Sequence, residues 1–233
     1  FIDFLFFIKI MNTNLIHHFQ TMRPAIEERI AAGKKLRVKF PRISQGVYKP
    51  AANRADPVAV LEKQAKTRLQ DLVPIRYARM LTSPFAFLRG AAAIMAADLA
   101  ASKTTGITVQ ACGDMHVANF GVFASAERNL IFGINDFDET IPGPWEWDLK
   151  RLCASVVASC RFLGGDEKLC EEAIRSAVKS YRKKMKRYAL MGNMELWYST
   201  IKDADILNMI PAYMKRNALR ILAKARTHTN IRV

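Results

Sequence analysis

The sequence has few of the residues from which metal and disulfide sites are built. Its 233 residues include four cysteines and four histidines, and no two cysteines have Cys-x-x-Cys spacing. A structural zinc site needs ligands at such spacing, and a secreted disulfide framework needs a higher density of cysteine. We therefore interpret the cysteines as reduced thiols of an intracellular protein and expect no structural zinc. They are Cys112, Cys153, Cys160 and Cys170.

A long apolar run is also missing. The apolar stretch at residues 1–10 is shorter than the roughly 20 residues that span a bilayer, and it has no cleavage-site pattern. We therefore predict a cytoplasmic protein without a transmembrane segment. The chain begins without Met, so residues 1–22 are interpreted as an extension or disordered segment ahead of a start at Met11 or Met22.

What the sequence does have is apolar content and positive charge. Half of its residues are hydrophobic, which predicts a folded globular protein. The formal net charge is +15, which favours partners such as nucleotide phosphates, nucleic acid or an anionic membrane surface. The basic residues form two clusters, one early and one late. The clusters are Lys34, Lys35, Arg37, Lys39 and Arg42, and then Arg182, Lys183, Lys184, Lys186 and Arg187.

Residues 23–54 are interpreted as a basic arm and residues 55–233 as one domain. Within the arm, only residues 36–40 alternate enough to predict a short strand. In the domain, a polar residue followed by proline predicts helix starts at Asp56 and Ser83, with Pro74 ending or kinking the first helix. The second helix is expected to cover residues 85–101 and to be buried because it is rich in alanine.

The second half of the domain alternates strands and helices. Residues 107–111 have strand periodicity, and residues 118–124 and 129–135 read as a hairpin. An amphipathic helix is predicted from Asp148 to a stop at residues 164–165, with Cys153 and Cys160 in the core. Further helices are expected over residues 166–191 and 194–229, the last interrupted at Pro211. The fold class is therefore α+β, mainly helical, with a small antiparallel sheet.

The most informative residues surround the predicted hairpin. Asp114 precedes it and Asp136 follows it, so both carboxylates, with Asn119, are expected at one edge of a small sheet. Oxygen ligands of this kind suit Mg²⁺, which is bound by one or two carboxylates with water and substrate phosphate. Asn119 and Asp136 are therefore candidate metal ligands. Asp114 is then free to orient an attacking hydroxyl or accept its proton.

Other polar side chains near this motif have open alternatives. His116 could bind phosphate or cap the turn, and Asp138 could contact phosphate or the residues around the metal. Arg76 and Arg89, with Arg79, flank the second helix and could reach phosphate, or could pair with carboxylates instead.

Three motifs resemble the catalytic half of the aminoglycoside-phosphotransferase and protein-kinase-like fold. They are Gly113-Asp114-x-His116-x-x-Asn119, Ile134-Asn135-Asp136-Phe137-Asp138, and Gly143-Pro144-x-x-x-Asp148-Leu149. The resemblance implies an ATP- and Mg²⁺-dependent phosphotransferase similar to the C-terminal lobe of kinases, with an unknown small-molecule or protein acceptor. It implies that Asp114 is the catalytic-loop aspartate and that Asn119 and Asp136 bind the metal. It also implies that Asp148 braces the loop.

Longer motifs resemble an uncharacterised bacterial family, domain of unknown function 2252, over roughly residues 23–226. They are Leu72-Val73-Pro74-Ile75-Arg76-Tyr77, Ser83-Pro84-Phe85-Ala86-Phe87-x-Arg89-Gly90, and residues 135–152, which run from Asn135-Asp136-Phe137-Asp138 to Asp148-Leu149-Lys150-Arg151-Leu152. This resemblance implies membership of the family but no substrate.

The sequence departs from kinase-like enzymes in two respects. It has no glycine-rich loop followed by a strand lysine, the parts that hold nucleotide phosphates. It also has Cys112 where many of these enzymes have histidine. We therefore expect a truncated product with an incomplete nucleotide site, whose phosphate-binding part lies downstream in a permuted order.

Two other function classes stay open. The run Gly113-Asp114-Met115-His116 also resembles the first metal motif of calcineurin-like phosphatases, but a two-metal phosphoesterase needs further histidine and aspartate ligands. A basic module that binds nucleic acid or another polyanion would use the late cluster, where Tyr181 and Tyr188 flank the basic residues and could stack on bases.

Overall fold

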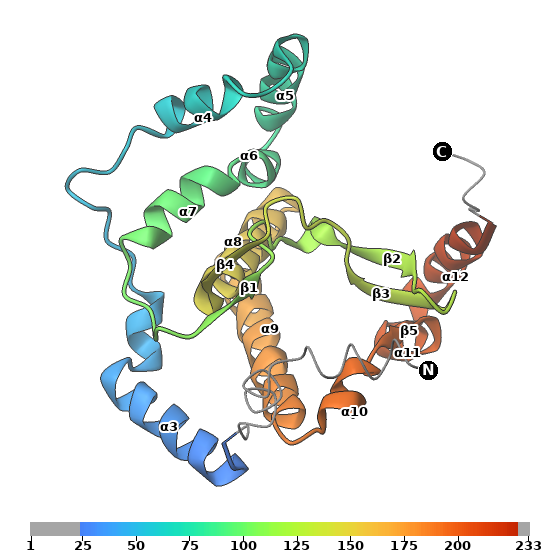
Figure 1. Cartoon of the computed structure of the whole chain (residues 1–233). Helices are drawn as coiled ribbons and strands as arrows, with labels where there is room; N and C mark the ends of the chain where they lie inside the picture. The colour runs from blue at the N-terminus through green and yellow to red at the C-terminus, as the bar shows by residue number, and fades with distance from the viewer. Residues whose placement is uncertain (1–23, 228–233) are drawn as a thin grey trace, which may run out of the picture. The chain divides into compact units, whose positions relative to one another are not determined.

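The computed structural model describes residues 24–227, and the chain divides into two compact units, residues 1–47 and residues 48–233 (Figure 1). Each unit is described by itself. The predictions for residues 1–22, including a start at Met11 or Met22, lie outside the described residues.

The described part of the first unit is helical. Helix α3 covers Ile26–Lys39 and the 3₁₀ helix η1 covers Arg42–Gly46. The prediction of a strand at residues 36–40 was wrong. The first turn of α3 has glutamates and its last turn has basic residues, which stabilises both ends of the helix dipole. The strand periodicity of five residues does not outweigh this stabilisation of the helix. No residue of α3 is buried.

Short helices form the first part of the second unit. They are α4 (Pro57–Ala65), the 3₁₀ helix η2 (Gln70–Leu72), α5 (Val73–Met80), α6 (Pro84–Gly90) and α7 (Ala92–Ala100). The predicted caps are confirmed: Asp56 accepts a hydrogen bond from the Ala59 N–H, and Ser83 from the Ala86 N–H. Proline follows each cap, at a position where a missing N–H costs nothing.

Two helix boundaries in this region differ from the prediction. Helix α4 ends at Ala65, so Pro74 lies in the first turn of α5 instead of ending α4. The expected helix over residues 85–101 is broken at Ala91 into α6 and α7. At Gly90 a Cβ atom would lie 2.5 Å from the Met80 side chain. The last residue of α6 therefore touches α5, a tertiary contact that periodicity does not show.

The apolar cluster of this region joins α4, α5 and α7. Leu61, Met80, Ala91 and Ile94 are its buried members, with Val60 and Tyr77 packed against it. The alanine-rich helix α7 is only partly buried, with Ile94 and Leu99 as its buried residues. This cluster fixes the helices that carry one side of the pocket described below.

The strands of the described residues form two small antiparallel sheets, as the α+β prediction requires. In the first, β1 (Thr108–Ala111) pairs with β4 (Ile141–Pro144). In the second, β2 (Phe120–Ala124) pairs with β3 (Leu130–Ile134), which pairs with β5 (Ile201–Lys202). The predicted hairpin is thus confirmed. Its register places Phe120 opposite Ile134, so the residues just before β2 and just after β3 lie at the same end.

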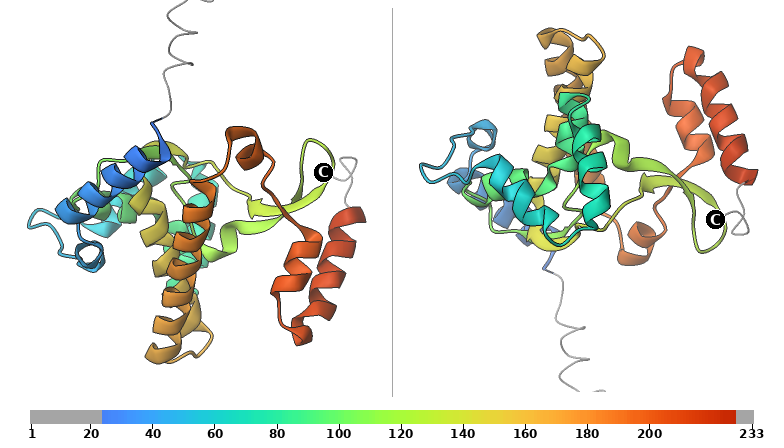
Figure 2. Two further views of the ribbon diagram at one scale, coloured as in Figure 1. Left: turned by 90° about the horizontal axis from the view of Figure 1, so that it is seen from below. Right: turned by 90° about the horizontal axis from the view of Figure 1, so that it is seen from above.

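Helices α8 (Trp145–Phe162) and α9 (Glu167–Tyr188) pack against each other and form the longest helical pair of the described chain (Figures 1 and 2). Helix α8 begins three residues before the predicted start at Asp148, and its stop before residues 164–165 is confirmed. The late basic cluster is exposed on α9.

The burial pattern of α8 differs from the prediction. Its buried residues are the polar Glu146, Arg151 and Ser155, whereas Cys153 and Cys160 are only half-buried. The side of α8 that contacts the β1–β2 region is polar. This polar side positions the candidate site.

The described chain ends in short helices. They are the helices α10 (Asn193–Trp197), α11 (Asp203–Met209) and α12 (Ala212–Thr227). The predicted interruption at Pro211 is confirmed, because it lies between α11 and α12. These two helices lie side by side in both views of Figure 2. No helix among the described residues is long and apolar enough to cross a membrane.

Candidate functional site

The loop after β1 is held by α8 through the Asp148 carboxylate. One oxygen accepts a hydrogen bond from the Cys112 N–H at 2.7 Å, and the other accepts one from the Gly113 N–H at 3.0 Å. Hydrogen bonds to an ionised acceptor are about twice as strong as neutral ones. The loop that contains Asp114 is therefore fastened to a rigid helix.

Gly113 permits the turn that this fastening requires. Its φ is +81°, a conformation that residues with a Cβ rarely adopt, and a Cβ there would lie 2.1 Å from the Glu139 carbonyl oxygen. The loop thus passes against the backbone that follows Asp138. Thr140 adds a link between the same two segments, because its hydroxyl donates to the Ala111 carbonyl at 2.6 Å.

Asp114 is buried and paired with a cation that the sequence analysis missed. The Arg151 guanidinium donates to one carboxylate oxygen through Nε at 2.7 Å and also through Nη2. The Nε2 atom of His116 lies 3.5 Å from the other oxygen. Burial raises the pKa of Asp114, but the hydrogen bond from His116 and the charge of Arg151 together lower it below its ordinary value. Asp114 is therefore ionised at neutral pH.

Arg151 and Ser155 extend the polar side of α8 behind the loop. Besides binding Asp114, Arg151 donates to the Leu88 carbonyl at 2.7 Å, which links the loop to α6. The Ser155 hydroxyl accepts from the Val117 N–H at 3.1 Å. Arg151 lies three residues after Asp148, so the two share a helix face. The three-residue spacing from Asp148 was the only signal in the sequence for the role of Arg151 beside the loop. Nothing in the sequence indicated which face of the helix would be buried.

Asn119 joins the two ends of the hairpin. Its side chain is buried, and its amide nitrogen donates to the Asp114 carbonyl at 3.2 Å and to the Asp136 carbonyl at 3.1 Å. The Asn135 N–H in turn donates to the Asn119 carbonyl at 3.0 Å. The three residues predicted from the motif spacing are thus brought together by one amide side chain.

Asp136 and Asp138 lie on the exposed side of this arrangement. An Asp136 carboxylate oxygen accepts from the Asp138 N–H at 3.2 Å, and the Cys112 thiol donates to the Asp136 carbonyl at 3.5 Å. Glu139 follows, and burial together with the charges of Asp114, Asp136 and Asp138 raises its pKa. Negative charge is therefore concentrated here, in the kind of environment that attracts a cation.

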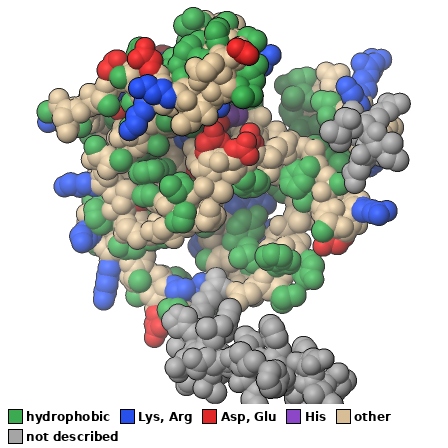
Figure 3. All heavy atoms as spheres, turned by 45° about the horizontal axis from the view of Figure 1, so that its top comes forward, with side chains coloured by type: hydrophobic (Ala, Val, Ile, Leu, Met, Phe, Trp, Pro, Cys, Tyr) green, Lys and Arg blue, Asp and Glu red, His purple; other side chains and the backbone are tan. Residues whose placement is uncertain are grey.

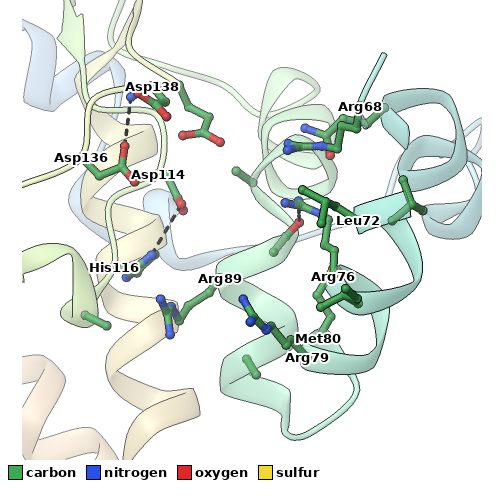
Figure 4. A pocket seen from close by; sticks show the side chains of 18 of the residues that line it. Arg68, Leu72, Arg76, Arg79, Met80, Arg89, Asp114, His116, Asp136 and Asp138 are labelled. Atoms are coloured by element: carbon green, nitrogen blue, oxygen red, sulfur yellow. Dashed lines mark hydrogen bonds and ion pairs between the residues drawn. The ribbon is translucent and has the colours of Figure 1, made fainter. Parts of the chain in front are cut away.

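These residues line one side of a pocket of about 1110 Å³ (Figures 3 and 4). We call this side the acidic wall and define it as Asp114, His116, Asn119, Asp136, Asp138 and Glu139. Figure 3 shows carboxylates gathered beside a histidine on this face of the molecule. The size of the pocket is that of a small-molecule site.

The opposite side of the pocket is basic. We call it the arginine wall and define it as Arg68, Arg76, Arg79 and Arg89, from the segment that spans α4 to α6. Figure 4 shows these side chains extending toward the acidic wall. Arg76 and Arg89 were candidates from the sequence, and Arg79 was noted with them. Arg68 was missed, because it lies outside every motif and only the fold brings it to the pocket.

The donor atoms of the acidic wall fit a hard cation better than a soft one. The candidate ligands Asn119 and Asp136 offer amide and carboxylate groups, the type that Mg²⁺ prefers. Among residues 24–227 there is no cluster of three or more His, Cys, Asp or Glu placed to hold a metal. A site here would therefore rely on the amide, on water and on ligand oxygens to complete the coordination.

The fold and the site together define a class of protein. It is a mainly helical α+β domain with a charged pocket, one wall of which is bound to helix α8. The chain belongs to the family described as "Uncharacterized protein conserved in bacteria (DUF2252)", whose model matches residues 68–233. The matched part contains both walls of the pocket and all of α8. No curated protein and no solved structure matches the chain.

Proposed function

We propose that the pocket is the site of an ATP- and Mg²⁺-dependent phosphotransferase related to kinase-like enzymes. The observation that carries the proposal is the link through Asn119, which holds the Asp114 and Asp136 segments together at one wall of the pocket. Phosphoryl transfer asks a protein mainly to position groups and to neutralise charge. A rigid acidic wall facing an arginine wall supplies both.

Each residue of the acidic wall has a proposed role. Asn119 and Asp136 would hold Mg²⁺, which neutralises phosphate charge when it is bound. The ionised Asp114 would accept a hydrogen bond from the acceptor hydroxyl and so orient it. His116 and Arg151 keep the Asp114 pKa low, which makes orienting the hydroxyl a larger part of the proposed role of Asp114 than strong base catalysis.

The remaining parts of the resemblance are supported more weakly. The fold as a kinase-like C-terminal lobe is a proposal that rests on the three motifs and on the fastening of the loop by Asp148. His116 is better explained as a partner of Asp114 than as a cap, because it lies 3.5 Å from that carboxylate. Asp138 contacts Asp136 through its backbone N–H, which supports a role beside the metal.

The test is phosphate transfer or release from γ-labelled ATP, measured on this chain and on another member of the family with Mg²⁺ present. Asp114→Asn and Asp136→Asn should each abolish turnover, because one removes the orienting carboxylate and the other a metal ligand. Asp166→Asn is the matched control, since Asp166 caps α9 away from the pocket and asparagine caps equally well. Unchanged turnover in Asp136→Asn would refute the assignment.

One observation favours binding of a polyanion as a second candidate function. All five members of the late basic cluster are exposed on α9. However, Tyr181 stacks on Trp145 with ring centroids 6.1 Å apart, so its ring is occupied on one face. Salt-dependent binding of single-stranded nucleic acid that is lost on neutralising Lys183 and Lys184 would support this alternative.

The phosphoesterase alternative receives less support. It needs several histidine ligands, and His116, the histidine that the structure describes, has its Nε2 directed to Asp114. Hydrolysis of a generic phosphomonoester with Mn²⁺ and without ATP would favour it.

A further inference from the structure

The arginine wall faces the acidic wall without pairing with it. Among the residues that the structure describes, none of the four guanidinium groups lies within 4.0 Å of a carboxylate. Arg76 donates to the Gly90 carbonyl at 2.6 Å, and Arg79 and Arg89 are exposed and make no side-chain hydrogen bond to another described residue. Figure 4 shows the guanidinium groups directed into the pocket. The arginine wall therefore has N–H donors that are not used by other described residues.

The charged groups around the pocket act on Arg76 in opposite directions. Burial, and then the positive charge of Arg68, lower the pKa of Arg76, whereas the charges of Glu139 and Asp114 across the pocket raise it. Elsewhere in this unit, the Arg54 guanidinium pairs with the Asp98 carboxylate. The arginine wall has no such partner, although a row of carboxylates lies across the same pocket.

A polar atom of the acidic wall also lacks a partner. His116 is 6% exposed and lines the pocket, and its Nδ1 atom has no hydrogen-bond partner among the described residues. Buried polar atoms are nearly always paired with protein, water or ligand. The unpaired nitrogen is thus a second and independent indication that the pocket is built for a polar occupant.

We propose that the arginine wall is a binding site for the phosphate groups of a ligand. Guanidinium groups bind phosphate oxygens in a bidentate manner, and several of them around one pocket match an oligophosphate or a phosphate ester. The proposal deepens the proposed function and rests on it for the view that a phosphate-bearing substrate enters this pocket. It assigns to arginines the role that a glycine-rich loop and a lysine have in kinases.

This proposal differs from the expectation of an incomplete nucleotide site. That expectation places the phosphate-binding part outside these 233 residues, and it predicts that this chain has no appreciable affinity for polyphosphate. The arginine wall predicts measurable affinity from this chain alone. Neither prediction involves a metal or turnover, so the two can be separated by binding measurements in Mg²⁺-free buffer.

The experiment is a calorimetric titration of the whole chain with two probes, tripolyphosphate and glycerol phosphate, in EDTA. Tripolyphosphate represents the tail of a nucleotide and glycerol phosphate a phosphorylated acceptor. Arg79→Gln/Arg89→Gln should weaken binding of the preferred probe by about tenfold or more, because each lost bond to a charged group is worth at least about one decade. Both side chains are exposed, so the double variant should unfold at the wild-type temperature.

The matched control is Arg182→Gln/Arg187→Gln, which removes the same charge from the late basic cluster on α9. It should leave the affinity within about twofold, because those arginines do not line the pocket. Arg79→Lys/Arg89→Lys should recover only part of the affinity, since lysine keeps the charge but not the planar fork. Preference for tripolyphosphate would identify a nucleotide tail as the ligand, and preference for glycerol phosphate a phosphorylated acceptor.

Two results would overturn the proposal. One is that neither probe binds the wild-type chain. The other is that the α9 control loses as much affinity as the pocket variant, which would mean a general attraction of anions to a basic protein. Failure of the proposed function is distinguishable, because loss of ATP turnover with retained tripolyphosphate binding would leave the arginine wall as a phosphate site.

Discussion

The acidic wall of the pocket is held from behind by the polar side of α8, whereas the arginine wall consists of three exposed side chains and the half-buried Arg76, all on short helices and the turn that precedes them. Behind the acidic wall, Asp148, Arg151 and Ser155 bind the backbone or side chains of the loop. On the arginine wall, Arg76 is the member whose side chain donates a hydrogen bond to another described residue. Position is therefore fixed on one side of the pocket and adaptable on the other.

The difference in how firmly the two walls are held agrees with the role proposed for each wall. A metal site and an orienting carboxylate need fixed geometry, because small displacements change coordination and proton transfer strongly. A phosphate group accepts hydrogen bonds from many directions, so long and mobile side chains can bind it. The comparison can be tested by variants whose effects on the two walls should differ.

The largest expected effect is that of Arg151→Met. It leaves the Asp114 carboxylate buried without its cation, which typically costs about 3–5 kcal/mol of unfolding free energy. Arg89→Met, on the arginine wall, should change stability by less than about 0.5 kcal/mol, because its guanidinium is exposed. Urea denaturation of both variants measures the difference. Similar losses would mean that the walls are not built differently.

Asp148→Asn should have the next largest effect. The loop loses two charge-assisted hydrogen bonds, and one of the two backbone N–H groups then faces the amide NH₂ of the new side chain. Together these changes should lower the free energy of unfolding by about 2–3 kcal/mol. Asp166→Asn is the control, because asparagine replaces aspartate at an N-cap with little loss. The measurement is again the free energy of unfolding. Equal stability of the two variants would show that Asp148 does not hold the loop.

Gly113→Ala tests the close approach of the loop to the Glu139 backbone. Gly164 has nearly the same φ, +82°, but a Cβ there would meet nothing within 4 Å. Both alanine variants should lose about 1–2 kcal/mol to the left-handed conformation. Gly113→Ala should lose about 1–2 kcal/mol more, because of the contact with the carbonyl. Thermal unfolding of the pair gives the difference, and identical melting temperatures would refute the contact.

The smallest effect concerns the charge on Glu139. Its pKa is raised in the folded state by burial and by neighbouring carboxylates. The folded state therefore favours the protonated form, and the resulting stability is present below the unfolded pKa and lost as pH rises through the folded pKa. Glu139→Gln should raise the melting temperature at pH 7 in EDTA, and the gain should fade as pH falls toward about 4.

Glu167→Gln is the control for that pH dependence, with the opposite sign. Its exposed pairing with Arg161 lowers the Glu167 pKa, so the charged form stabilises the folded state above the unfolded pKa. The variant should be slightly less stable than the wild type at pH 7 and equal to it at low pH. A stabilising Glu167→Gln, or a destabilising Glu139→Gln, would contradict the assigned signs.

The parts of the molecule that the sequence predicted are those with local patterns. Asp56 and Ser83 predicted two helix starts, and the strand-like segments on either side of Ser125 predicted the β2–β3 hairpin. The positions of Asp114, Asn119 and Asp136 followed from that hairpin, because antiparallel pairing returns the chain to its starting edge. The proposed kinase-like function of these residues stays a prediction.

The parts that could not be predicted depend on tertiary packing. Arg151 and Ser155 lie on an amphipathic helix, where polar residues are usually assigned to solvent. Arg68 lies in a segment without a motif, and Gly90, just before the break at Ala91, lies against Met80. To predict any of these features, one must know which elements are in contact. Sequence periodicity does not contain that information.

The most direct test of the account is the effect of Mg²⁺ on ATP binding to this chain, measured by calorimetry for the wild type and for Asp136→Asn. The account predicts that Mg²⁺ strengthens ATP binding to the wild type and that Asp136→Asn removes this gain while retaining the Mg²⁺-free affinity supplied by the arginine wall. An ATP affinity that does not respond to Mg²⁺, or that responds equally in both proteins, would contradict it.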